Sequence, residues 1–131
     1  MADIIKPTLY ILMFKDVPDM NPGKGMAQAS HASAKFVADN IGKDTPYFDE
    51  WLNEGRGFGT TCVLSVSGST LYDNIRGGGF PINIIEDVTY PYKNWYGETF
   101  VMSIETCAYI FVTPLTPEHI AEYIKSLPLH P

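Results

Sequence analysis

The sequence predicts an α/β protein, a single-domain, three-layer α/β/α sandwich around a four-stranded mixed β-sheet. Two observations predict it. Short apolar runs rich in β-branched and aromatic residues alternate along the 131 residues with stretches of helical periodicity. With 45% hydrophobic residues, the chain is also long enough to bury a core without disulfides or metals. Strands that alternate with helices build a sheet covered by helices.

The first strand is predicted at residues 8–14 (TLYILMF), a nearly continuous apolar run typical of a strand buried on both faces. A loop over residues 15–21 leads to the run NPGKGMAQASHA at residues 21–32. We expect this run to form an active-site loop that leads into a helix. The helix is predicted over residues 25–41 and should end near Gly42.

The start of that run has the features of an anion site. Pro22 fixes φ, and Gly23 and Gly25 let the backbone turn tightly, so free N–H groups are expected beside Lys24. A helix N-terminus of this kind attracts anions. The run has neither the G-x-x-x-x-G-K-[ST] nor the G-x-G-x-x-G motif, which argues against a nucleoside triphosphate.

In an α-helix each residue is rotated by about 100° about the helix axis from the one before it. With this rotation, the polar side chains of the predicted helix lie on one side. The opposite side is expected to pack on the core and carries Met26, Ala29, Ser30, Ser33 and Val37. The polar side carries Lys24, Gln28, His31, Lys35 and Asp39. Lys35 and Asp39 are interpreted as solvated helix surface. For the three residues nearer the loop, ligand binding and solvation both stay open.

Thr45 and Pro46 are predicted to cap and begin a short helix that reaches Gly55. Trp51 in this helix is assigned to the core, with base stacking as the alternative. Residues 55–59 (GRGFG) form a turn, in which Arg56 is either an exposed loop residue or a phosphate contact. The second strand is predicted at residues 61–66.

Residues 67–69 (SGS) are predicted to cap a short helix that carries Leu71, Tyr72 and Ile75. The glycines at 77–79 are interpreted as a turn into a third strand at 81–85, because a phosphate cradle would follow a strand and precede a helix. Glu86 and Asp87 at the end of this strand are either catalytic carboxylates or turn formers.

Residues 90–97 (YPYKNWYG) form a surface excursion with Lys93 among four aromatic residues. A hairpin packed on its own aromatic rings is the first interpretation, and base stacking or a protein interface is the alternative. The fourth strand is predicted at residues 107–112. Thr116 and Pro117 then cap and begin the last helix, whose buried stripe is Ile120, Tyr123, Ile124 and Leu127.

Composition limits the functions to consider. The net charge of −6 argues against a surface that coats nucleic acid broadly, although a local basic site stays open. No apolar run reaches membrane-spanning length, so we expect a cytoplasmic protein with no membrane partner. Cys62 and Cys107 lie in apolar runs and are interpreted as buried thiols. Together with three scattered histidines they give no zinc-ligand spacing.

Two stretches resemble the archaeal and eukaryotic type of peptidyl-tRNA hydrolase, whose signature is a glycine-lysine loop followed by an A-x-Q-x-S-H-A helix after the first strand. They are Gly23-Lys24-Gly25 and the run AQASHA at residues 27–32. Ile85-Glu86-Asp87 resembles the family's I-x-D segment, and the order of elements agrees over nearly the whole chain. Where the family loop reads M-G-K-G-K, this chain has one lysine. Where the family continues A-G-R-T-Q after the aspartate, this chain has Val88-Thr89-Tyr90-Pro91.

The resemblance implies hydrolysis of the ester that joins a peptide to the terminal ribose of tRNA, without a metal or a cofactor. Asp87 is then the group that orients or activates water, Lys24 stabilises the oxyanion or binds a phosphate, and Thr89 hydrogen-bonds near Asp87. The implied substrate-binding residues are Gly23, Gly25, Gln28, His31, Arg56 and Lys93. The implied partner is the acceptor end of peptidyl-tRNA, and a homodimer stays open.

Two other functions stay open at this stage. One is a catalytically inactive protein of the same fold that binds a protein or small ligand through residues 90–97. The other is an amidase or esterase that acts on a small substrate. Ser-His-Asp catalysis is disfavoured, because Ser30 is expected on the packing side of the helix and points about 100° away from its neighbour His31.

Overall fold

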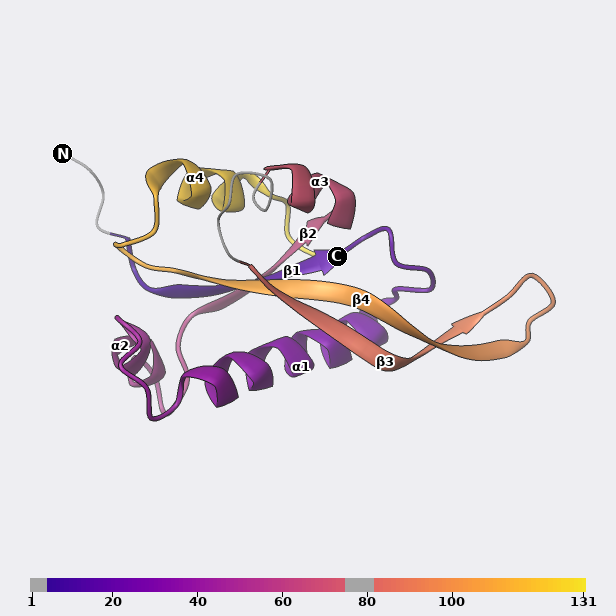
Figure 1. The fold of residues 1–131 in the computed structure, drawn as a ribbon, viewed down its shortest axis with the longest axis horizontal. Coiled ribbons are helices and arrows are strands. Elements are labelled where there is room, and N and C mark those ends of the chain that lie inside the picture. Colours follow the sequence, from indigo (N-terminus) through magenta and orange to yellow (C-terminus); the bar gives the residue numbers. More distant parts are fainter. Residues whose placement is uncertain (1–4, 75–81) are drawn as a thin grey trace.

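A four-stranded mixed sheet lies at the centre of the computed structural model, which describes residues 5–74 and 82–131, with side chains for 5–71 and 82–131 (Figure 1). The strands are β1 (Thr8–Phe14), β2 (Thr61–Val66), β3 (Asn83–Lys93) and β4 (Thr99–Val112), in the spatial order β2-β1-β4-β3. β1 pairs in parallel with β2 and antiparallel with β4, and β3 pairs antiparallel with β4. The predicted α/β fold with a mixed sheet is confirmed.

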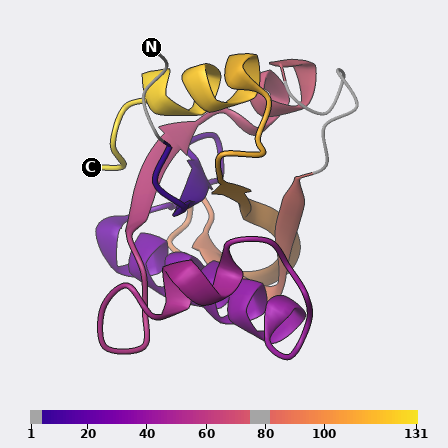
Figure 2. The same ribbon diagram turned by 90° about the vertical axis from the view of Figure 1, so that its left-hand side faces the viewer.

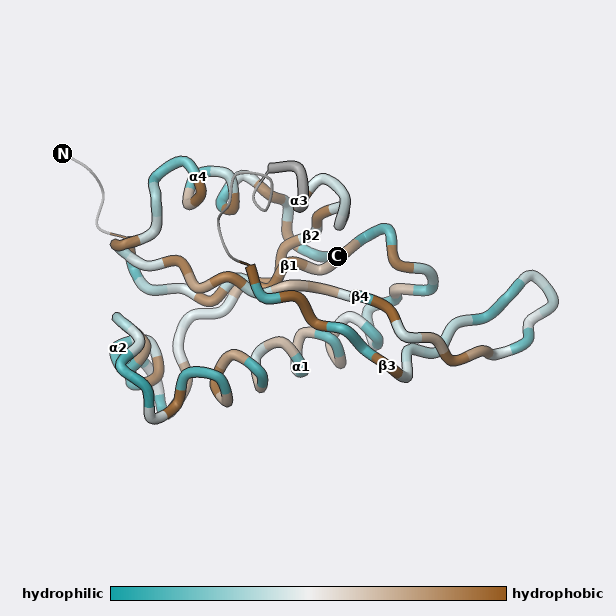
Figure 3. The backbone as a smooth tube through the Cα atoms, viewed as in Figure 1, coloured by the Kyte–Doolittle hydropathy of each residue, from teal (hydrophilic) through white to brown (hydrophobic). Residues whose placement is uncertain are grey.

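Helices cover both faces of the sheet (Figures 1 and 2). On one face lie α1 (Pro22–Asn40) and α2 (Phe48–Leu52), and on the other lie α3 (Gly68–Asn74) and α4 (Glu118–Ser126). The strands between them include long hydrophobic runs, above all in β1 and β4 (Figure 3). Alternate residues of β1 enter opposite cores: Ile11 packs on the α1 side, and Leu12 packs on the α4 side.

The core on the α1 side is rich in aromatic rings. Trp51 is 2% exposed, its ring centroid lies 5.1 Å from that of Phe36, and its Nε1–H donates to the carbonyl of Thr60. The assignment of Trp51 to the core is therefore confirmed. Cys107 is also buried, whereas Cys62 is half-buried, and both are free thiols.

Helix α1 begins three residues earlier than predicted, so the glycine-lysine run is its first turn. Asn21 is the N-cap, its side-chain oxygen accepts the Lys24 N–H, and Pro22 occupies the first turn. Of the N–H groups expected to be free around Lys24, that of Lys24 donates to the Asn21 side chain and that of Gly25 donates to the Asn21 carbonyl, so neither is free. Gly42 has φ +75° and lies just beyond the helix end, as predicted.

The predicted packing face of α1 was correct only in part, since Ala29 and Val37 pack against the core. The buried residues are Gly25, Gln28, Ala32 and Phe36, whereas Met26 is 71% exposed and Ser30 is exposed. The true face is rotated toward the polar side because Gln28 finds hydrogen-bonding partners inside the protein. Gly25 and Ala32 are small enough to let the helix lie close to its neighbours.

The starts of α2 and α4 differ from the predicted caps, whereas α3 begins at Gly68, within the predicted cap at residues 67–69. Tyr47, with φ 67°, is the N-cap of α2, while Thr45 donates to the Asn40 side chain instead. Pro117 is the N-cap of α4, and the Thr116 hydroxyl accepts the Thr113 N–H. At α3, the Asp16 carboxylate accepts the Gly68 N–H. Ile75, the glycines at 77–79 and the start of the predicted third strand at residue 81 lie outside the described residues, as does the Tyr72 side chain.

Strands β3 and β4 form a hairpin that is much longer than predicted. β3 continues to Lys93 and β4 begins at Thr99, so residues 90–97 are the end of a two-stranded arm that extends past β1 (Figure 1). The Asn94 side chain accepts two turn N–H groups, and Gly97 has φ +77°. The predicted hairpin is confirmed. Its rings pack only in part, since Tyr92 and Phe100 lie 5.8 Å apart whereas Trp95 is 101% exposed.

Candidate active site

The candidate site lies where the first turns of α1 meet β3. Asp87 stands inside β3, so the expectation that it follows the end of a strand was wrong. The pairing of β3 with β4 shifts register between Ile85 and Glu86 and again between Asp87 and Tyr90. Irregular pairing of this kind turns side chains out of the regular alternation of a strand. It lets the Asp87 carboxylate meet the side of α1.

The Asp87 carboxylate is held at both oxygens. Gln28 Nε2 donates to Oδ2 at 2.6 Å. The Thr89 N–H donates to Oδ1 at 2.9 Å, and the Thr89 hydroxyl donates to the same oxygen at 3.2 Å. Asp87 is half-buried and Thr89 is exposed. The carboxylate is therefore fixed in direction on a face that solvent can reach.

Gln28 is in turn oriented from inside the protein. It is 3% exposed, and its Oε1 accepts the hydroxyl of Thr106, which is fully buried, at 2.7 Å. Because the amide oxygen faces this hydroxyl, the amide nitrogen faces Asp87. Thr106 was not predicted as a site residue. The sequence feature that could have pointed to Thr106 is its hydroxyl, which stands directly before the apolar run at residues 107–112.

Hydrogen bonding decides the protonation state of Asp87. Partial burial acts to raise its pKa, but the hydrogen bonds from Gln28 and Thr89, with the charge of nearby His31, outweigh burial and hold the pKa below its ordinary value. The group is therefore an ionised hydrogen-bond acceptor at neutral pH. A carboxylate with a low pKa is a weak base, and it is better suited to orienting a water molecule than to removing its proton.

Lys24 is positioned by residues at the base of the hairpin. Its ammonium donates to the Pro91 carbonyl at 2.8 Å, lies 5.1 Å from the centroid of the Tyr90 ring and is 3.9 Å from Asp19 Oδ2. Tyr90 is fully buried, and its hydroxyl donates to the Pro18 carbonyl. An ammonium has three donors, so Lys24 can bind an anion while it keeps its bond to Pro91.

A comparison with protein families identifies the family of the chain. The family model of peptidyl-tRNA hydrolase PTH2 matches residues 8–130. The chain belongs to this family. The match spans β1, the helix with the glycine-lysine turn, the Asp87 segment and α4. No curated protein matches the chain.

In this PTH2-family protein, two further predicted residues lie beside Asp87 and Lys24. His31 is exposed one turn after Gln28 and is near enough for its charge to lower the Asp87 pKa. Lys93 ends β3, and its N–H donates at 2.6 Å to the Asp19 carboxylate that Lys24 approaches. The predicted residues Lys24, Gln28, His31, Asp87, Thr89 and Lys93 therefore share one region of the protein.

The remaining predicted residues are placed differently. Gly23 lies exposed in the first turn of α1. Gly25 is buried, and a Cβ there would lie 2.6 Å from His130 Nε2, so the close approach at this glycine is made by the C-terminal segment. Arg56 is exposed in the connection after α2, a helix that packs on the distal half of α1 through Phe36. The structure does not bring Arg56 to the other site residues.

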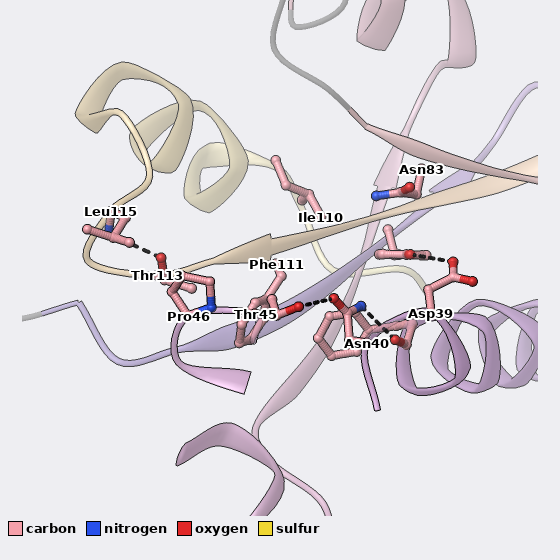
Figure 4. A pocket seen from close by; sticks show the side chains of 11 residues that line it. Asp39, Asn40, Thr45, Pro46, Asn83, Ile110, Phe111, Thr113 and Leu115 are labelled. Carbon is pink, nitrogen blue, oxygen red and sulfur yellow. Dashed lines mark hydrogen bonds between the residues drawn. The ribbon is translucent and has the colours of Figure 1, made fainter. Parts of the chain in front are cut away.

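Two hollows lie elsewhere on the PTH2-family fold. One, of about 380 Å³, is beside the C-terminal end of α1, where the Tyr109 hydroxyl donates to Asp39 at 3.1 Å and Thr45 donates to Asn40 (Figure 4). The other, of about 360 Å³, lies at the α3 face beside Asp16. Neither includes Lys24 or Asp87. Within the described residues, no group of three or more His, Cys, Asp or Glu side chains could hold a metal ion, and no helix is long and apolar enough to cross a bilayer.

Proposed function

We propose that this protein hydrolyses the ester bond between a peptide, or an N-blocked amino acid, and tRNA, and so releases free tRNA. Family membership over residues 8–130 supports the reaction class. The observation that carries the site assignment is the Asp87 carboxylate, held by Gln28 and Thr89 on the same face of the protein as Lys24.

In the proposed mechanism, a water molecule donates a hydrogen bond to Asp87 and its oxygen attacks the ester carbonyl carbon. The bond from that carbon to the ribose oxygen breaks, and the proton from water ends on the ribose hydroxyl. Lys24 stabilises the negative charge that develops on the carbonyl oxygen, or binds the terminal phosphate. Thr89 and Gln28 keep Asp87 in place, and His31 and Lys93 contact the tRNA end.

We propose that residues 1–131 act as one domain in the cytoplasm, with no metal or cofactor. Gly23 and Gly25 then shape the turn that carries Lys24, and Arg56 is a phosphate contact remote from the ester. A homodimer stays an open alternative.

The test is cleavage of a defined N-acetyl-aminoacyl-tRNA by the purified protein in the presence of EDTA. We expect wild type to release tRNA, and Lys24→Ala and Asp87→Asn each to lose most of the rate while their circular dichroism and melting temperature stay near wild type. A wild-type protein without activity would contradict the function. Full activity in both variants would contradict the site.

A second candidate function is favoured by one observation, the complete exposure of Trp95 at the end of the hairpin. It is a catalytically inactive protein that binds a protein or small ligand through residues 90–97. A wild type that leaves the ester intact but binds a partner through Trp95 would support it.

A further inference from the structure

The hairpin arm, defined as residues 88–101, carries two aromatic side chains at its end that face solvent. Trp95 is 101% exposed and Tyr96 is 87% exposed, whereas Tyr92 and Phe100 pack on each other further down the arm. The arm projects from the body of the protein at the end of the sheet opposite α2 (Figure 1). Its end therefore offers two rings to a partner at some distance from the core.

The charge of the arm differs from that of the rest of the chain. Lys93 and Glu98 are the only charged residues in the arm, so its formal charge is zero, and the remaining residues carry the whole net charge of −6. A polyanion approaching this acidic protein is therefore repelled less along the arm, which carries Lys93 next to its turn, than over the rest of the surface.

The base of the arm is continuous with the candidate site. Asp87 directly precedes the arm, and the Lys24 ammonium bonds to the Pro91 carbonyl within it. Strand geometry places Trp95 roughly 26 Å along the chain from Asp87, at about 3.3 Å per residue. A single strand of nucleotides whose terminal ester lies at Asp87 can run along the arm and reach the rings.

We propose that Trp95 and Tyr96 stack on unpaired bases of the tRNA acceptor end while its terminal ester lies between Lys24 and Asp87. This inference rests on the proposed function and identifies the surface that binds the substrate. Aromatic rings stack on any base, so this contact requires neither a basic patch nor a particular sequence. The arm thereby provides nucleic-acid affinity to a protein whose overall charge opposes it.

The test measures binding and does not depend on cleavage. The probe is a fluorescein-labelled single-stranded RNA that ends in CCA, followed by anisotropy, with unlabelled RNA used to quench tryptophan fluorescence. Because Trp51 is 2% exposed, quenching reports on Trp95. We expect saturable quenching in wild type and an affinity about tenfold or more weaker in Trp95→Ala. Phe58→Ala, which truncates a 68% exposed ring near α2, should keep wild-type affinity.

Each result has a defined meaning. Equal affinity in Trp95→Ala and wild type, or no quenching by the RNA, overturns the inference. Self-association that depends on Trp95, seen by sedimentation without RNA quenching, also overturns it and identifies a second copy as the partner. If the RNA binds through Trp95 and wild type cleaves no ester, the proposed function is wrong, whereas the inference that Trp95 and Tyr96 stack on bases remains supported. If cleavage persists with an unchanged KM in Trp95→Ala, the function stands and the inference fails.

Discussion

Thr106→Val tests whether the buried hydroxyl behind Gln28 controls the candidate site. Valine has nearly the shape of threonine, so the substitution mainly removes the hydrogen bond from the hydroxyl to Gln28 Oε1, 2.7 Å long at a fully buried position. Leaving this carbonyl oxygen without its donor should lower the free energy of unfolding by about 1–3 kcal/mol. Urea denaturation measures this loss.

The same change should alter catalysis through Asp87. Without Thr106, the Gln28 amide is no longer oriented, and Asp87 loses part of the hydrogen bonding that lowers its pKa. The Asp87 pKa should therefore rise, and the acid limb of the rate profile should move to higher pH. We expect kcat to fall with little change in KM, because Thr106 is buried and does not reach the substrate.

The pH dependence of stability has a defined sign. The Asp87 pKa is lowered on folding, so its contribution is fully present above the ordinary value of 3.8 and is lost as pH falls through the lower folded value. Thr106→Val should reduce this contribution. Thr106→Ser keeps the hydroxyl and should restore the acid limb and most of kcat. The reasoning would be refuted if Thr106→Val kept the wild-type acid limb and kcat, and if its free energy of unfolding stayed within about 0.5 kcal/mol of wild type.

Two further predictions concern packing. Gly25→Ala would place a new Cβ 2.6 Å from His130 Nε2, so the His130 ring must move, and this clash offsets the gain of about 1 kcal/mol that alanine gives over glycine within a helix. Thermal unfolding should therefore show no gain from Gly25→Ala in the wild-type background and a gain of about 0.5–1 kcal/mol in the His130→Ala background. An equal effect of Gly25→Ala in both backgrounds would contradict the contact. Burial raises the pKa of Cys107 to about 11, so iodoacetamide at pH 8 should label Cys107 only after denaturation, which peptide mass mapping can follow. Rapid labelling of native Cys107 would contradict this.

Much of the site could be predicted from the sequence because its residues lie in short segments with distinct composition. The glycine-lysine turn and the polar residues after it identified Lys24, Gln28 and His31 on one helix. Asp87 and Thr89 followed a strand-forming run. The structure brings all five into one region, with Gln28 buried beneath Asp87, and their chemical roles stay predictions.

The roles of Gln28 and Thr106 could not be assigned in this way. Periodicity treats glutamine as a surface residue, and it is buried here only because Asp87 from β3 and Thr106 from β4 satisfy its amide. Those partners are 59 and 78 residues away in sequence. The same long-range pairing explains why the packing face of α1 was predicted only in part.

The hairpin shows the same division between local and tertiary information. The sequence by itself determined the alternation of strands and helices, the glycine-lysine turn and the aromatic run at residues 90–97, because each depends on neighbouring residues. Only the tertiary structure decided that Asp87 lies within an irregular strand, that Lys24 bonds to Pro91 and that Trp95 stands fully exposed at the end of an arm. These features depend on the register of β3 against β4 and on the packing of α1 on the sheet, which join residues far apart in the chain.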